Sequence, residues 1–299
     1  MNFDWDDMRI FLEIQRTGRL NRAAKRLGSS HTTVARRLKA MEAKFGLSLF
    51  DDTEDGLVPS EFGQQVLSHA QDMEAAATAI ADQADRLTGS GSKRVRVGAP
   101  DGFGNAVLSH ILPQYMAADP SMEVELVPIP VTHKLWRRDV DIAISLDRPQ
   151  TGRLVMRKLT DYDLRLYAGP AFFNDKPRPK SRQDLRELPF VGYVDELLYT
   201  RELDFNTIIL PGLNIVYRGA TVKAQFDAVR GNVGLGVLPC FMARESDLEP
   251  VLPEEITFSR TYWLLYPEEY RDLERIRSVS DYIVGATRNM GAHFKFDCA

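Results

Sequence analysis

The chain has 299 residues, of which 44% are hydrophobic and 27% charged, and its formal net charge at pH 7 is -4. This length allows about two domains, and the composition is that of a globular protein rather than a disordered chain. The sequence lacks an apolar run of about eighteen residues and a secretory signal, so we expect a cytoplasmic protein with no membrane partner. Having only two cysteines, Cys240 and Cys298, argues against a disulfide framework.

Charge is distributed unevenly at the start of the chain. Residues 1–50 contain ten Lys and Arg but five Asp and Glu, whereas residues 51–63 contain five Asp and Glu and no Lys or Arg. A basic module followed by an acidic strip indicates a nucleic-acid-binding head on a larger body. A helical packing unit with a solvated basic face has the same pattern, and periodicity alone leaves both interpretations open.

Short helices are predicted in this head from apolar residues at helical spacing, around Phe11, Ala23 and Val34. Gly28 ends the second helix and Ser30 can cap the third, which is typical of a helix-turn-helix whose second helix enters the DNA major groove. The side of that helix away from its apolar face offers donors and acceptors to base edges. The candidate DNA-binding residues are Ser30, His31, Thr32, Thr33, Arg36 and Arg37.

The segment 11–50 resembles the winged helix-turn-helix of LysR-type transcriptional regulators. The residues that carry the resemblance are an aromatic in the first helix, an Ala-Ala pair before a Leu-Gly stop, and a Glu-x-x-x-Gly-x-x-Leu-Phe run: Phe11, Ala23, Ala24, Leu27, Gly28, Glu42, Gly46, Leu49 and Phe50. The resemblance implies an all-α winged helix-turn-helix domain over residues 1–60, with the wing at 49–63. The usual family glutamine is His31 here, and the usual wing arginine is Asp52.

A long helix is expected next, with Ser60 as its N-cap. Its apolar residues alternate spacings of four and three: Val66, Ala70, Met73, Ala77, Ile80, Ala84 and Leu87. Packing on its own domain would explain this stripe, but a narrow a/d seam favours pairing with a second copy. The resemblance likewise implies that the linker helices pair antiparallel in a homodimer, and that two dimers pair to form a homotetramer. We therefore assign residues 61–92 to a linker, dimerisation helix and hinge.

From residue 93 to 299 the pattern changes to strands alternating with helices, which predicts an α/β domain with a mostly parallel sheet. Strands are expected at 94–98, 123–127, 141–145, 164–168 and 215–217, and helices from about 105 to 116 and at 222–230. The segments 140–144 and 231–239 resemble the LysR-type effector domain. This resemblance implies a two-lobed, type 2 periplasmic-binding-protein-like fold, with a second lobe at about 164–265.

Ligands of open α/β sheets bind at the carboxyl ends of strands and at helix N-termini. By this rule the candidate effector-binding residues are Gly102, Phe103, Gly104, Asn105, Ser145, Ala220 and Thr221. Each also has an ordinary interpretation as turn or cap chemistry. The resemblance implies an effector of unknown identity. The segment 128–140 is shorter than the family's usual helix, so we expect one wall of the pocket to be altered.

Other kinds of site lack the necessary residues. A calcium loop starting at Asp51 would have Phe62 where a bidentate glutamate is required, and the five histidines show no metal-ligand spacing. Neither a nucleophile elbow nor a phosphate loop occurs. Cys240 is interpreted as an inert buried thiol rather than a redox sensor. We therefore expect no catalytic residues, no metal and no cofactor, and hence no enzyme.

The predicted function is that of a nucleoid-associated LysR-type regulator. Such a regulator binds promoter DNA sequence-specifically and senses a small molecule through its C-terminal domain, which changes the DNA bend. RNA polymerase is a further expected partner. Two alternatives are a small-molecule-binding protein with a weakened DNA-binding head and a ligand-independent architectural DNA protein. Specific DNA binding that responds to metabolites separates the first hypothesis from both alternatives.

Overall fold

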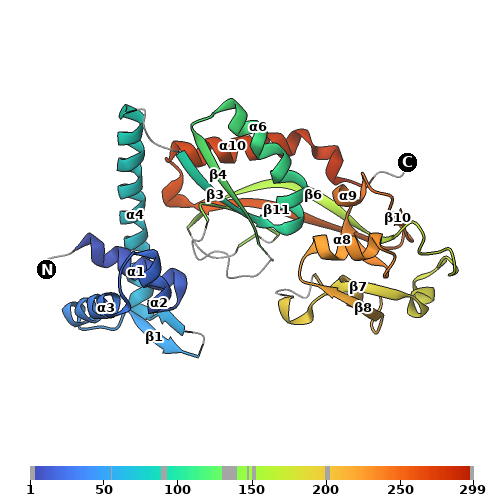
Figure 1. Ribbon diagram of the computed structural model, residues 1–299, viewed down its shortest axis with the longest axis horizontal. Helices are drawn as coiled ribbons and strands as arrows, with labels where there is room; N and C mark the ends of the chain where they lie inside the picture. Colours follow the sequence, from blue (N-terminus) through green and yellow to red (C-terminus); the bar gives the residue numbers. More distant parts are fainter. Residues whose placement is uncertain are drawn as a thin grey trace. The chain divides into compact units, whose positions relative to one another are not determined.

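The computed structural model (Figure 1) describes residues 4–54, 56–88, 93–129, 140–146, 148–149, 153–198 and 203–296. The chain divides into two compact units, of which the first extends to residue 91 and the second begins at residue 92. Most of the segment 128–140, with its predicted short pocket wall, lies outside the described residues.

The first unit begins with a winged helix-turn-helix, as predicted. It consists of α1 (Trp5–Thr17), α2 (Leu20–Arg26), α3 (His31–Phe45) and the antiparallel wing strands β1 (Phe50–Thr53) and β2 (Gly56–Pro59). Phe11 is fully buried in its core, with its ring centroid 5.1 Å from that of Phe50. Gly28, with φ of 61°, makes the left-handed turn that separates α2 from α3. Local signals therefore predicted this unit well.

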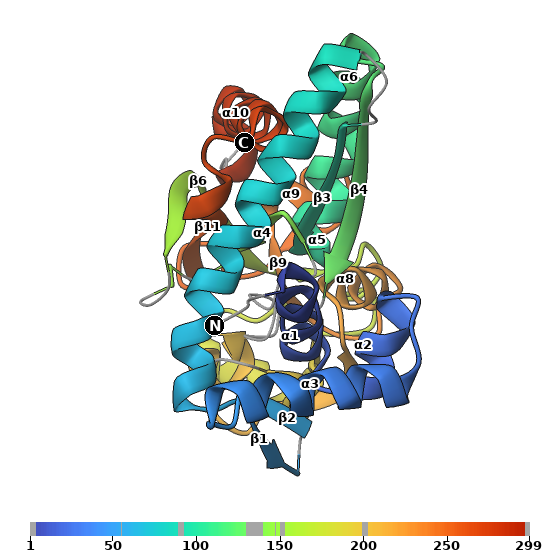
Figure 2. The same cartoon turned by 90° about the vertical axis from the view of Figure 1, so that its left-hand side faces the viewer.

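The long helix α4 (Glu61–Thr88) leaves the wing and passes α1 (Figure 2). Ser60 begins it, because its Oγ accepts a hydrogen bond from the Gly63 N–H at 3.0 Å. Arg16 of α1 forms an ion pair with Glu74 of α4, in which Nη2 and Oε2 are 2.5 Å apart. The first half of α4 is thus attached to the head by its own contacts.

The second unit is built on a seven-stranded mixed sheet. Its path is β10 (Glu249–Pro250), β6 (Leu154–Ala168), β11 (Thr257–Pro267), β5 (Ile142–Ser145), β3 (Lys93–Pro100) and β4 (Met122–Ile129), and β9 (Gly236–Pro239) pairs with β6. In the first lobe, β3 is parallel to both β4 and β5. The α/β class is confirmed.

The expectation of a mostly parallel sheet is wrong, because β6 and β11 are long antiparallel partners that continue from one lobe into the other. The chain enters the second lobe along β6 and returns along β11, so the two strands must run in opposite directions. β6 also starts at Leu154, ten residues before the predicted strand 164–168. Its early residues are only partly buried, which hides the apolar pattern expected of a strand.

Helices cover the first lobe on one side. The chain after β3 forms α5 (Asp101–Phe103), a π-helical turn at 104–108 and α6 (Ser109–Ala118). The last long helix of the chain, α10 (Glu274–Asn289), lies beside α6, as Figure 1 shows. The Tyr282 hydroxyl donates to the Ile111 carbonyl at 2.9 Å, which fixes the two helices together.

The second lobe is smaller and contains the parallel pair β7 (Pro189–Tyr193) and β8 (Asn214–Gly219). Between these strands lies α7 (Phe205–Ile209), and after them come α8 (Val222–Arg230) and α9 (Cys240–Ala243). The bounds of α8 are those predicted from the sequence. This helix packs on β7, β8 and β9.

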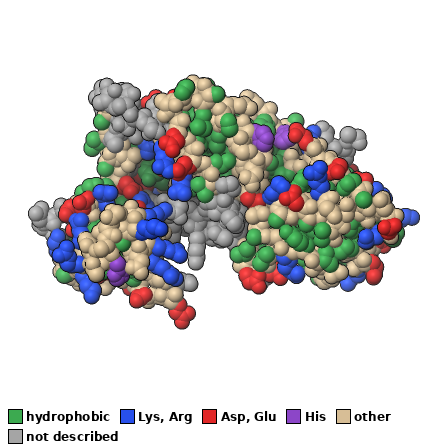
Figure 3. Space-filling view, in the orientation of Figure 1, with side chains coloured by type: hydrophobic (Ala, Val, Ile, Leu, Met, Phe, Trp, Pro, Cys, Tyr) green, Lys and Arg blue, Asp and Glu red, His purple; other side chains and the backbone are tan. Residues whose placement is uncertain are grey.

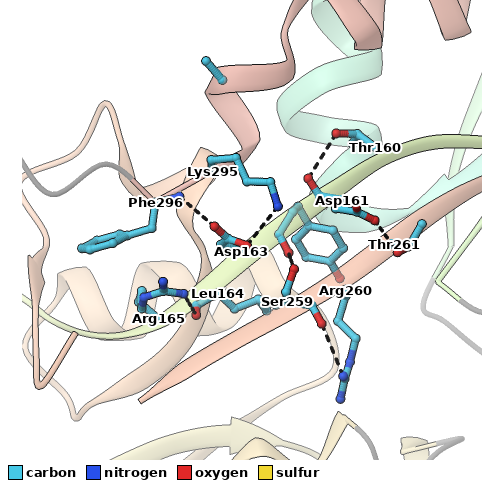
Figure 4. Close-up of polar contacts among 12 residues, drawn as sticks. Thr160, Asp161, Asp163, Leu164, Arg165, Ser259, Arg260, Thr261, Lys295 and Phe296 are labelled. Atoms are coloured by element: carbon cyan, nitrogen blue, oxygen red, sulfur yellow. Dashed lines mark hydrogen bonds and ion pairs between the residues drawn. The ribbon is translucent and has the colours of Figure 1, made fainter. Parts of the chain in front are cut away.

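The last described residues are bound to β6 by polar contacts, shown in Figure 4. The Asp163 carboxylate accepts from the Phe296 N–H at 3.1 Å and pairs with Lys295 at 3.3 Å. Burial alone would raise the pKa of Asp163, but these donors outweigh it and lower that pKa. The Arg165 guanidinium lies 4.6 Å from the Phe296 ring centroid. The C-terminal segment is therefore part of the packed second unit.

Candidate nucleic-acid interface and ligand site

The exposed side of α3 carries most of the predicted DNA-binding residues. Val34, Leu38 and Met41 are buried, which turns the opposite side of the helix to solvent. His31, Thr32 and Arg36 are exposed there, and Thr33 is partly buried. Arg36 has no ion pair within the described residues, so its guanidinium is available for a ligand.

Ser30 begins α3. Its Oγ accepts the Thr33 N–H at 3.1 Å and lies 2.9 Å from the Thr32 hydroxyl. The first turn of α3 contains no acidic residue, so its free N–H groups and positive dipole end face solvent without a counter-charge of their own. This is a suitable place for a phosphate group.

Arg37 has a different position from the other predicted DNA-binding residues. Its guanidinium donates to Asp7 at 2.8 Å and to Asp4 at 3.0 Å, and it lies 3.9 Å from Asp6. Asp7 is itself buried, so Arg37 attaches α3 to the start of α1. The spacing of α3 alone could not reveal this, because the acidic partners lie about thirty residues earlier in the chain.

Further exposed bases lie on the head beside the predicted set. Arg22 and Lys25 on α2 and Lys39 on α3 are exposed, and Figure 3 shows Lys and Arg side chains along the edges of the head. Their charge was visible in the sequence, but their shared exposure follows from the packing of α2 against α3.

The wing carries acidic side chains on its surface. Asp51, Asp52 and Glu54 are exposed, and Asp55 lies outside the described residues. Figure 3 shows the corresponding cluster of Asp and Glu at the tip of the head. The Leu57 N–H donates to the Gly18 carbonyl at 2.9 Å, which holds β2 against the turn after α1. Within the described part of the chain these wing carboxylates form no ion pairs.

The predicted dimer seam divides into two parts. Ala70 is fully buried in the core of the head, and Val66 and Met73 pack against that core. Farther along α4, Ile80 is 69% exposed, Ala77 is partly buried and Ala84 is exposed. The Leu87 side chain lies outside the described residues. A partner helix would therefore meet the distal part of α4 rather than the whole stripe.

The predicted effector residues are dispersed in the second unit. Gly102, Phe103 and Gly104 are buried, and Phe103 belongs to the main core. Asn105 and Ala220 are exposed and Ser145 is partly buried. Thr221 is the N-cap of α8, since its Oγ1 accepts from the Ala224 N–H at 3.2 Å. None of these residues lines a cavity found in the second lobe.

That cavity has a volume of about 320 Å³ and lies in the second lobe among β7, β8 and α7. Its wall includes Tyr193, Gln225 and the ion pair between Arg218 and Asp195, whose Nε and Oδ2 are 3.5 Å apart. Gln225 is 2% exposed, and its Nε2 approaches the Tyr193 hydroxyl without a hydrogen bond of normal geometry. The volume suits a small molecule, and the Gln225 amide N–H can donate to an acceptor.

Asp101 is a buried carboxylate that lies between the two lobes. It is absent from the site residues predicted from the sequence. Its Oδ2 accepts the Lys223 N–H of α8 at 3.1 Å. Burial raises its pKa, and backbone N–H groups of Lys223, Val222 and Gly102 offset part of that effect. An aspartate directly after a strand was the available signal, but its partner lies 122 residues later.

Metal-binding and membrane-spanning features are not evident in the part of the chain that the structure describes. Among the described residues, no group of three or more His, Cys, Asp or Glu side chains is arranged to hold a metal ion. The helices in the same residues include none that is long and apolar enough to cross a membrane. Cys240 is buried, and burial raises the pKa of its thiol, which disfavours the reactive thiolate.

Two family models match the chain. The model described as the bacterial regulatory helix-turn-helix protein of the lysR family matches residues 5–64, and the LysR substrate binding domain model matches residues 88–288. The first match covers the head and the second covers most of the lobed unit, in agreement with the two units of the structure.

Similar proteins also cover nearly the full chain. The Mau operon transcriptional activator of Paracoccus denitrificans is 29% identical over 282 residues, which are 93% of this chain and 95% of that protein. A full-length OxyR variant from Pseudomonas aeruginosa has a TM-score of 0.65 at 17% identity and covers 96% of this chain and 95% of its own. ArgP from Mycobacterium tuberculosis has a TM-score of 0.68 at 13% identity, covering 96% and 98%. These structures show the same fold.

Proposed function

The chain belongs to the LysR family of bacterial transcriptional regulators, and on that premise we propose that α3 reads the operator sequence while the lobed unit responds to a small molecule. The observation that carries the proposal is the solvent-facing side of α3, where His31, Thr32 and Arg36 lie together. An arginine that reaches the major groove can donate two hydrogen bonds to guanine.

The remaining residues of α3 have supporting roles. Ser30 caps the helix, so its first N–H groups are held in place for a backbone phosphate. Arg37 orients α3 through Asp4 and Asp7 and contacts DNA only if those ion pairs open. Base discrimination therefore falls mainly on three side chains, which are His31, Thr32 and Arg36.

The wing is proposed to stay away from the DNA phosphates. The carboxylates of Asp51, Asp52 and Glu54 are exposed and would repel the phosphate backbone at close range. This leaves the α2 and α3 bases as the source of non-specific attraction.

Self-association is proposed through the distal part of α4, where the exposed Ile80 side chain lies. A dimer would present two α3 helices to half-sites about one DNA turn apart. We further propose a homotetramer formed by two dimers, contact with RNA polymerase and a cytoplasmic, nucleoid-associated location. We propose no catalytic role.

A small-molecule effector is proposed because the chain has the lobed domain of its family and a second-lobe cavity of about 320 Å³. LysG of Corynebacterium glutamicum, with a TM-score of 0.63 and 18% identity, was solved with its bound effector Arg. A ligand that prefers one lobe arrangement would shift the population toward it and so change the DNA complex.

The test is DNA binding by the full chain to a duplex that the wild type selects from a random library, with a shuffled duplex as the reference. Arg36→Ala should weaken specific binding by about 1–3 kcal/mol, or roughly 5- to 150-fold, and reduce discrimination at one base position. The matched control is Arg9→Ala, because Arg9 is also exposed but pairs with Asp6 on α1.

Failure of selection to enrich any sequence would contradict the proposal and favour a ligand-independent architectural role. Equal losses for Arg36→Ala and Arg9→Ala would show that α3 contributes charge only. Repeating the titration with pools of cellular metabolites separates a responsive regulator from a ligand-independent one, because the latter keeps the same affinity throughout.

A further inference from the structure

The start of α8 is occupied by a carboxylate from the other lobe. Asp101 follows β3 in the first lobe, is 7% exposed, and accepts the Lys223 N–H of α8 at 3.1 Å. The Val222 N–H also faces this carboxylate. The Asp101 side chain thus accepts hydrogen bonds from backbone N–H groups in the first turn of α8.

Backbone donors rather than a cation balance the Asp101 charge. The Lys223 ammonium is bound to Asp227 at 2.5 Å, and Asp101 forms no ion pair within the described ranges. The N-terminus of a helix has a positive partial charge that stabilises an anion. Asp101 therefore occupies the position that an anionic ligand would take at α8.

The backbone beside this contact is closely packed. A Cβ atom on Gly102 would lie 2.5 Å from Val222 Cγ1 and 3.3 Å from Met242 Sδ, so the two lobes touch at the glycine. Aromatic rings lie next to it: the Phe103 and Tyr262 centroids are 4.4 Å apart, and Tyr262 stacks on Tyr162 at 4.2 Å.

We propose that Asp101 is a specificity-determining residue that occupies the anion-binding position at the start of α8, excludes small carboxylates and phosphates from it, and joins the two lobes. The regulatory meaning of this contact rests on the proposed effector-responsive function. The contact itself does not depend on that function.

The second-lobe cavity indicates the class of ligand that remains. Its charged lining residues are Asp195, Asp204 and Arg218, so carboxylates outnumber the guanidinium. Tyr193 lines the cavity, and burial and then the Asp101 charge raise the pKa of its phenol. A neutral or cationic small molecule, with donors toward these carboxylates, fits this charge distribution better than an anion.

The test is rescue of a truncated side chain by free formate. Asp101→Ala in the full chain removes the carboxylate and leaves a space of similar size at the α8 N-terminus. We expect a lower Tm than wild type in sodium chloride, and a saturable rise in Tm when sodium formate replaces chloride at equal ionic strength. Wild type should have the same Tm in both salts.

A matched control is Asp184→Ala. Asp184 accepts backbone N–H groups from Lys180 and Ser181 at 2.8 and 3.0 Å, but all three residues lie in one surface turn of the second lobe. This variant should show no formate-specific gain. A gain in wild type as large as in Asp101→Ala, or no loss of Tm in Asp101→Ala, would overturn the proposal.

Hydrogen exchange provides a second measurement that does not require the alanine variant to fold. Asp101→Asn keeps the size of the side chain but removes its charge. The amides of Val222 and Lys223 should exchange about tenfold faster or more, because a charge-assisted hydrogen bond is weakened. Unchanged exchange at these two amides refutes the contact, whatever the result with formate.

The same proteins separate this proposal from the proposed regulatory function. Formate rescue and amide exchange need no DNA, so they can succeed while specific DNA binding fails. Conversely, intact operator binding with no formate rescue and no change in exchange would overturn the role of Asp101 alone.

Discussion

The N-termini of helices α3 and α8 have the same local capping chemistry but different tertiary surroundings. Ser30 accepts the Thr33 N–H at 3.1 Å, and Thr221 accepts the Ala224 N–H at 3.2 Å. Neither helix has an acidic residue in its own first turn. The start of α3 faces solvent, whereas the start of α8 receives the Asp101 carboxylate from another lobe. A helix start is thus available to a ligand only if tertiary contacts leave it open.

The largest expected effect is at the closed helix start. Gly102→Ala places a methyl group within 2.5 Å of Val222 Cγ1, so the lobes must separate or distort. We expect a loss of about 3 kcal/mol in the free energy of unfolding, measured by urea titration. Gly285→Ala on α10 is the control, since nothing lies within 4 Å of its added Cβ. A helix-interior glycine replaced by alanine should gain roughly 0.5–1 kcal/mol. Equal stability of both variants would contradict the close contact.

The open helix start depends on Arg37. Among the described residues, Arg37→Ala leaves the buried Asp7 carboxylate with Lys44, 3.7 Å away, as its one remaining ion-pair partner. We expect the free energy of unfolding of the head to fall by about 2 kcal/mol, because a buried charge loses its partner. Arg36→Ala should change stability little and DNA binding more. The reverse pattern in thermal melts and DNA titrations would exchange the roles assigned to the two arginines.

Reversing a wing charge should have a smaller effect. Asp52→Arg adds a base at an exposed position of the wing, in the same unit as the proposed DNA-binding helix α3. We expect tighter binding to any DNA and a salt dependence steeper by about 0.9 for each new phosphate contact. Binding constants measured from low to moderate salt give this slope. An unchanged slope would place the wing away from the phosphates in the complex.

The pH dependence of stability should also reflect the closed helix start. Burial raises the pKa of Asp101 above its unfolded value of about 3.9, so the folded chain binds a proton more tightly in the window between the two values. Stability therefore falls as pH rises through this window. The nearby phenols Tyr193 and Tyr262 have raised pKa values and stay neutral there. The unfolding free energy of wild type minus that of Asp101→Asn should decrease from acid to neutral pH. An increase would contradict this assignment.

Elements with local signals were predicted well. The head was predicted from its caps, Gly28 and its apolar spacing, and α8 was predicted at 222–230 because Thr221 caps it and its apolar face is regular. The strand 164–168 was predicted too short. The first ten residues of β6, at 154–163, are stabilised by pairing with β11, which lies about a hundred residues later, rather than by a strong apolar pattern of their own.

The candidate site residues follow the same division. The exposure of His31, Thr32 and Arg36 was predictable, because it requires only that Val34 and Leu38 face the core of the head. The ion pairs of Arg37 and the packing of Ala70 were not, because their partners lie on other helices. Gly102 and Phe103 looked like a ligand loop in sequence but are covered by the second lobe and the core.

By itself, the sequence determined the helix starts, the basic surface of the head, the acidic wing and the family fold, since each depends on residues a few positions apart. Only the tertiary structure decided which helix start is free. The contact that closes α8 joins residues 122 positions apart, and no local pattern at Asp101 or at Lys223 contains that information.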